Sequence, residues 1–141
     1  MIQQLQKLKI VEILPFEQTH FFSFTMPAKI KLNKELVRLN YGKYAPFDNP
    51  GIVYTTHADR SYIWFHQKKT SAYFVLPESY LLYQNFKKRY DNALIVINDA
   101  VIKVLVIKKG TLADAYTLAR YDSQLIEMAK FEHGVDTTVQ I

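Results

Sequence analysis

The stretch that decides the fold runs from Ala93 to Ala119 and has the sequence A-L-I-V-I-N-D-A-V-I-K-V-L-V-I-K-K-G-T-L-A-D-A-Y-T-L-A. Its apolar, β-branched segments are separated by Asn98-Asp99 and by Lys108-Lys109-Gly110. Runs of this kind predict strands joined by tight turns, and the lack of apolar spacing at three and four argues against a helix. We therefore expect a three-stranded meander of Ala93–Ile97, Val101–Ile107 and Thr111–Leu118. Lys103 interrupts the second strand, so this position is expected to reach solvent.

The composition indicates a folded chain of modest size. Its 141 residues suit one domain or two small lobes, and 49% hydrophobic residues exclude a disordered chain. There is no cysteine, so disulfides and thiolate metal sites are excluded, which fits a reducing compartment. No apolar run approaches the roughly 20 residues of a membrane span, and the first ten residues lack the apolar core of a signal peptide. These features predict a soluble, cytoplasmic chain.

The net charge of +5 comes from 18 Lys and Arg against 13 Asp and Glu. Such an excess can steer a protein toward nucleic acid or another anionic partner. The basic residues are spread along the chain, however, mostly beside turns and predicted element ends. Dispersed cations give only weak, salt-sensitive binding that ignores base sequence. We therefore expect solvated basic surface and no specific nucleic-acid partner.

Short elements are predicted before the meander. Leu8–Leu14 and Phe21–Met26 are candidate strands, and a proline follows each. Asn33 can cap a short helix that ends at Gly42, because glycine tolerates a left-handed stop. Two prolines and a Pro-Gly pair predict a loop over residues 44–51. The next segments are expected to form a hairpin and a further strand: Ile52–Thr56 with Ser61–His66, then Ala72–Leu76.

A helix is predicted between these strands and the meander. Pro77 can occupy its first turn, Glu78 is favourable there, and Lys87-Lys88-Arg89 would close it. Aromatic and basic residues interleave over Tyr80–Tyr90, which would also suit stacking on single-stranded nucleic acid. Because an aromatic stripe at helical period is normally packing, we favour a core helix.

A last helix is predicted after the meander. Asp122 or Ser123 can cap it, and Gly134 can end it. The tail Val135–Ile141 is either a short strand or a linker. The apolar residues of this helix recur at a helical period: Leu125, Ile126, Met128, Ala129 and Phe131.

The residues contain no motif for catalysis or metal binding. Of the four histidines no two form an i, i+4 pair, and His57 and His66 are expected to be solvated at a turn and at a strand end. No serine lies in a G-x-S-x-G elbow, and Asp99 is better explained as a turn residue that bonds its own backbone. Four isolated glycines offer no phosphate cradle. We expect no catalytic residue, no metal and no cofactor.

Three features together carry a family resemblance. The first is the meander followed by a helix over Tyr121–His133. The second is V-L-P-E-S-Y-L-L at Val75–Leu82, and the third is M-P-A-K-I-K-L-N-K-E-L-V-R-L-N-Y-G-K-Y-A-P-F at Met26–Phe47. In this order they resemble the actin-like cytoplasmic domains of inner-membrane platform proteins in bacterial type II secretion and type IV pilus systems.

The resemblance implies a mixed α/β fold, RNase H-like in the actin manner. A single cytoplasmic domain over residues 1–141 would form two small lobes, 1–76 and 77–141, each with sheets and flanking helices. Actin-like ATPases carry glycine-rich phosphate turns between the first two strands of each lobe, whereas Asn98-Asp99-Ala100 stands here. The resemblance therefore implies a non-enzymatic scaffold. The alternatives are a nucleotide-binding actin-like ATPase and a basic nucleic-acid-binding domain.

The same resemblance implies partners and a location. A platform scaffold recruits the assembly ATPase and other platform proteins at the cytoplasmic face of the inner membrane, to which a segment outside these residues attaches it. No small-molecule substrate is implied, and a homodimer is compatible with this interpretation. We predict docking through Lys87, Lys88, Arg89 and Tyr90, where charge for steering adjoins an aromatic anchor. A basic helix end that complements the helix dipole is the alternative explanation of this cluster.

Overall fold

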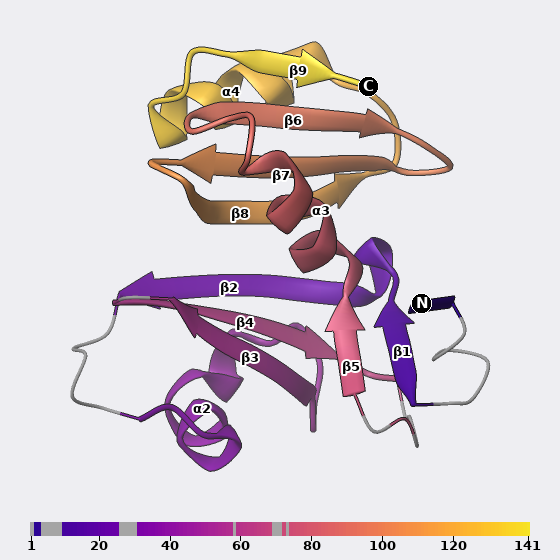
Figure 1. Cartoon of the computed structure of the whole chain (residues 1–141), viewed down its shortest axis with the longest axis vertical. Helices are drawn as coiled ribbons and strands as arrows, with labels where there is room; N and C mark the ends of the chain where they lie inside the picture. Colours follow the sequence, from indigo (N-terminus) through magenta and orange to yellow (C-terminus); the bar gives the residue numbers. More distant parts are fainter. Residues whose placement is uncertain (1, 4–9, 26–30, 58, 69–71, 73) are drawn as a thin grey trace. The chain divides into compact units, whose positions relative to one another are not determined.

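The chain folds into two units, which Figure 1 shows in a computed structural model. The structure describes residues 2–3, 10–25, 31–57, 59–68, 72 and 74–141. The first unit comprises Met1–Tyr80 and the second Leu81–Ile141, so the boundary falls inside helix α3 (Glu78–Phe86). No helix of the described residues has the length and hydropathy of a membrane span.

The predicted meander is confirmed in the second unit. Strands β6 (Ala93–Asn98), β7 (Ile102–Lys108) and β8 (Thr111–Leu118) pair antiparallel in sequence order. Lys109 and Gly110 join β7 to β8, and both have positive φ, 52° and 74°. A two-residue turn with this conformation matches the twist of the strands it connects, which is why a glycine stands there.

Helix α4 (Ser123–His133) covers one face of this sheet (Figure 1). Asp122 caps it by accepting hydrogen bonds from two backbone N–H groups, and Gly134 ends it in the left-handed conformation. Both predicted ends of the helix are confirmed. The meander packs against this helix in a buried cluster of Leu94, Val96, Ile102, Val104, Val106, Ile126, Ala129 and Val135.

The tail of the chain returns to the sheet. Strand β9 (Thr138–Gln140) pairs parallel with β6, which gives the order β8-β7-β6-β9. Of the two alternatives for this segment, the short strand is therefore correct. The expectation for Lys103 was wrong: its side chain is buried and pairs with Asp99, Nζ to Oδ2 3.1 Å. The pairing offsets part of the cost of burying the ammonium.

The first unit holds an antiparallel sheet of order β2-β4-β3 and a parallel pair of strands, β1 with β5. The predicted hairpin is confirmed by β3 and β4. The start of the first predicted strand and Met26 lie outside the described residues. The bounds are β1 Val11–Leu14, β2 Thr19–Thr25, β3 Gly51–His57, β4 Arg60–His66 and β5 Phe74–Pro77.

Helix α2 (Lys34–Tyr41) packs on one face of the three-stranded sheet through Val37. The predicted cap is confirmed, since Asn33 Oδ1 accepts the Leu36 N–H at 2.8 Å. The predicted left-handed stop at Gly42 was wrong. Gly42 is right-handed (φ −57°, ψ −27°), because the chain tightens into a 3-10 turn, Gly42–Tyr44, rather than reversing.

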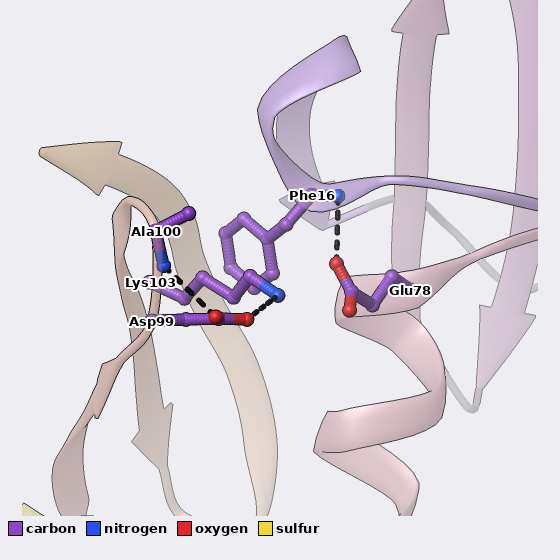
Figure 2. Close-up of polar contacts among 5 residues, drawn as sticks. All are labelled: Phe16, Glu78, Asp99, Ala100 and Lys103. Atoms are coloured by element: carbon purple, nitrogen blue, oxygen red, sulfur yellow. Dashed lines mark hydrogen bonds and ion pairs between the residues drawn. The ribbon is translucent and has the colours of Figure 1, made fainter. Parts of the chain in front are cut away.

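Aromatic side chains of β2 and β4 form a second layer in this unit. Phe21, Tyr62 and Trp64 lie with ring centroids 5.3–6.1 Å apart. The Trp64 indole N–H donates to Ser79 Oγ at 2.8 Å, which satisfies a buried donor. Glu78 accepts the Phe16 N–H at 2.8 Å, as Figure 2 shows. These two bonds tie the start of α3 to strand β4 and to the 3-10 turn Phe16–Gln18.

Helix α3 is shorter than predicted at both ends. Pro77 is the last residue of β5 rather than part of the first helical turn. The helix ends at Phe86, so Lys87, Lys88 and Arg89 follow it as a turn and do not form its last turn. The Arg89 and Tyr90 N–H groups both bond to the Phe86 carbonyl at 3.0 Å, a tightening typical of helix ends.

Candidate functional site

Helix α4 presents an apolar stripe that its own unit leaves exposed. Of the five apolar residues that recur at a helical period in this helix, Ile126 and Ala129 are buried. Leu125, Met128 and Phe131 are 43%, 57% and 89% exposed. Residues three apart are neighbours on a helix surface, so these three form a continuous ridge. Single exposed apolar residues are common, but a contiguous ridge typically marks an interaction site.

A shallow groove runs between this ridge and strand β8. Its volume is about 220 Å³. One part of its wall is apolar and includes Leu118, Leu125 and Met128, while the other part carries the charged or polar side chains of Asp114, Tyr116, Glu132 and His133. Phe131 lies outside this lining. The groove and the ridge together form the candidate binding surface, which we call the α4–β8 surface.

The polar part of the groove is acidic. Burial raises the pKa of the Tyr116 hydroxyl, and the negative charges of Asp114 and Glu132 raise that pKa further. His133 Nε2 lies 3.7 Å from Asp114 Oδ2, so the imidazole pairs with this carboxylate when it is protonated. The groove is locally negative, although the chain as a whole has a net charge of +5. The α4–β8 surface therefore favours a ligand that is apolar along its length and positive at one end.

The turn between β6 and β7 is the place where a phosphate-binding turn would be expected. Asp99 Oδ1 accepts the Ala100 N–H at 2.8 Å, and Oδ2 accepts from Lys103 Nζ at 3.1 Å (Figure 2). The backbone hydrogen bond is the main cause that lowers the pKa of this carboxyl, followed by Lys103. The prediction that Asp99 bonds its own backbone is confirmed. A carboxylate thus takes the amide and the ammonium that a phosphate would need.

The predicted docking cluster lies in the turn after α3. Lys88 and Arg89 are exposed. Lys87 is half-buried, with its Nζ 5.4 Å from the centroid of the Tyr83 ring. Tyr90 is half-buried too, and its ring centroid is 6.4 Å from that of Phe86. The aromatic member therefore packs partly within its own unit, and docking through these four residues stays a prediction.

Other candidate residues give no catalytic or metal centre. The described part of the chain contains no group of three or more His, Asp or Glu side chains that could hold a metal ion. His57 is exposed as predicted, whereas His66 is buried, 7% exposed, against the expectation of a solvated imidazole. The exposed ridge on α4 was not predicted either. The sequence does contain a sign of this ridge: the helix has more apolar residues than one buried face can accommodate.

Comparison with known proteins supports the fold. Neither a protein-family model nor a curated protein matches the sequence. A solved structure from Bacteroides thetaiotaomicron VPI-5482, a protein with actin-like ATPase fold and unknown function, is similar with a TM-score of 0.62 at 11% identity. The match covers 92% of this chain and 56% of that chain, so these residues span little more than half of the neighbour's length. The likeness shows the fold alone: a mixed α/β chain of the actin-like ATPase kind.

Proposed function

We propose that this chain is a non-enzymatic docking module that binds an amphipathic helix of another protein on the α4–β8 surface. The observation that carries the proposal is the exposed ridge Leu125, Met128 and Phe131 beside an acidic groove. An amphipathic helix that lies in such a groove anchors itself through apolar residues at positions i, i+3, i+4 and i+7. Its opposite charge at one end sets its direction in the groove.

The partner helix carries Lys or Arg at the end that meets the acidic part of the groove. Asp114 and Glu132 lie close enough to Tyr116 to raise the pKa of its hydroxyl, so their field is felt within the groove. The chain as a whole is positive and repels a basic peptide at long range. Binding of a basic helix would therefore be due to the local acidic groove and not to the net charge of the chain.

Nucleotide hydrolysis, the enzymatic alternative, has weaker support. The fold is compatible with it, as the neighbour with an actin-like ATPase fold indicates. The β6–β7 turn, however, uses its amide and Lys103 on the Asp99 carboxylate. A phosphate at that turn would meet a like charge. A protein-docking role needs no change in these contacts.

Within this proposal, the partner class is that of the platform scaffolds which the sequence resembles. The module would recruit an assembly ATPase of a type IV pilus or type II secretion system at the cytoplasmic face of the inner membrane. The actin-like fold is compatible with this assignment, and Lys87, Lys88, Arg89 and Tyr90 offer a second surface for it. Mutations at the two surfaces should change peptide binding differently, so a peptide titration of the variants shows which surface is the binding site.

The test uses a fluorescent helix of about 18 residues, built from Leu at i, i+3, i+4 and i+7 with Lys elsewhere. We call it the Leu/Lys peptide. Fluorescence anisotropy should show a dissociation constant in about the micromolar range, with binding at least about tenfold weaker when Glu replaces Lys. A shuffled peptide of the same composition removes the stripe and should also bind about tenfold more weakly.

The control is the chain with Lys87→Glu, Lys88→Glu and Arg89→Glu. If the α4–β8 surface is the site, this variant should bind the Leu/Lys peptide within about threefold of the native chain at about 150 mM salt. Equal affinity for the Glu peptide or the shuffled peptide would contradict the proposal. A tenfold change in the triple variant alone would move the site to the turn after α3.

A further inference from the structure

A cationic cavity in the first unit is formed entirely by residues of that unit. Its volume is about 450 Å³, within the range of small-molecule sites. Helix α2 contributes Lys34 and Arg38, one turn apart, and Lys68 follows strand β4. The start of β3, an edge strand in the order β2-β4-β3, supplies part of the wall through Gly51–Tyr54.

His66 lines the same cavity and has an unusual environment. It is 7% exposed, and its Nδ1 is buried without a hydrogen-bond partner among the residues that the structure describes. Its ring lies directly over Gly51, where an added Cβ would come within 2.3 Å of Cε1 and 2.8 Å of Nδ1. Only glycine leaves room for this ring. A buried ring nitrogen without a partner is energetically costly, and the same ring lines the cavity.

The charges around the imidazole are mainly positive. Burial is the largest cause that lowers the pKa of His66, and the positive charge of Lys34 lowers it further. A hydrogen bond with the Lys68 backbone and the negative charge of Glu12 raise the same pKa. Glu12 also pairs with Lys68, Oε1 to Nζ 2.6 Å, and Arg38 has only a long contact to the exposed Glu35, 4.0 Å. Within the described part of the chain, no carboxylate forms an ion pair with Lys34.

We propose that this cavity binds an organic phosphate monoester. The phosphoryl group would be held by Lys34 and Arg38 and would accept a hydrogen bond from the His66 imidazolium. A dianion with three acceptor oxygens suits donors that come from separate elements better than a carboxylate does. The organic part would lie against the half-buried apolar side chains of Val53 and Val75. This site does not depend on the α4–β8 surface.

The test uses phenyl phosphate as the probe, with inorganic phosphate and benzoate as the comparison ligands. Calorimetry should show a dissociation constant of about a millimolar or below for phenyl phosphate, and binding at least about tenfold weaker for the other two. If inorganic phosphate bound as tightly as phenyl phosphate, the organic group would not contribute to binding. If benzoate bound as tightly, the site would not be specific for a phosphoryl group.

The site is located by NMR titration of the His66 imidazole with pH. The midpoint should rise when phenyl phosphate is bound, because the dianion stabilises the imidazolium. Lys34→Gln with Arg38→Gln should weaken binding about 30-fold and abolish that rise, and both side chains are exposed, so the fold should persist. The matched control, Lys31→Gln with Lys43→Gln, removes the same charge from the same unit and should leave binding within about twofold. Equal losses in the two double variants, or an unmoved midpoint, would overturn the proposal.

Discussion

Replacement of Met128 by lysine should weaken binding of the Leu/Lys peptide by about 30-fold or more. Met128 stands in the middle of the exposed ridge and lines the groove, so it is placed as a central anchor. The variant loses the apolar contact and brings a positive charge against the lysines of the peptide. Because the side chain is 57% exposed and Lys is as good a helix former as Met, the free energy of unfolding should change by less than about 0.5 kcal/mol.

Two variants make this expectation specific. Met128→Glu loses the same apolar contact but adds attraction to a basic peptide, so it should bind more tightly than Met128→Lys. Leu39→Lys makes an equivalent change at a residue of α2 that is 82% exposed, and it should leave peptide binding unchanged. If the Glu variant bound the Leu/Lys peptide more weakly than the Lys variant, the electrostatic part of the proposal would be wrong. An effect of Leu39→Lys would show that the peptide binds without a preferred site.

Replacement of Trp64 by alanine should destabilise the chain by about 3–5 kcal/mol. Trp64 is almost fully buried and contacts the rings of Phe21, Tyr62 and Tyr80. Its indole N–H also donates to Ser79, so the truncation leaves both a cavity and a buried hydroxyl that loses this donor. Urea denaturation followed by circular dichroism measures the change, since the chain has no other tryptophan to follow by fluorescence.

Trp64→Phe separates the two parts of that loss. It keeps most of the ring packing and removes only the donor, so its effect should be about 1–3 kcal/mol. Phe131→Ala is the matched control for loss of an aromatic side chain, and at 89% exposure it should cost less than about 0.5 kcal/mol. If Trp64→Ala were as mild as Phe131→Ala, the aromatic layer of the first unit would contribute little to its stability.

Features set by local chemistry were predictable from the sequence. The β-branched runs after Asp91, the caps at Asn33 and Asp122, and the left-handed end at Gly134 all appear where the residues indicate them. Each depends on a side chain and the backbone within a few residues of it, so no knowledge of distant partners is needed. The prediction of a left-handed stop at Gly42 was wrong because a glycine permits a left-handed conformation without requiring one.

Features set by distant partners were not predictable in this way. Periodicity shows that the last helix is apolar but not which residues its sheet covers, and Met128 and Phe131 fall outside the covered part. His66 stands at a strand end, where solvation is usual, yet its ring is buried over Gly51, a residue 15 positions earlier in the chain that is its strand partner. Both of the proposed sites arise from such contacts. Sequence motifs alone therefore could not locate them.

Binding of a basic amphipathic helix along α4 and β8 can be tested by hydrogen–deuterium exchange, measured with and without a saturating amount of the Leu/Lys peptide. We expect the peptide to slow exchange at amides of residues 111–118 and 121–134 and to leave the turn 87–90 unchanged. Slowed exchange at residues 87–90 without any change over 121–134 would contradict it, as would peptide binding that slows no amide in the second unit.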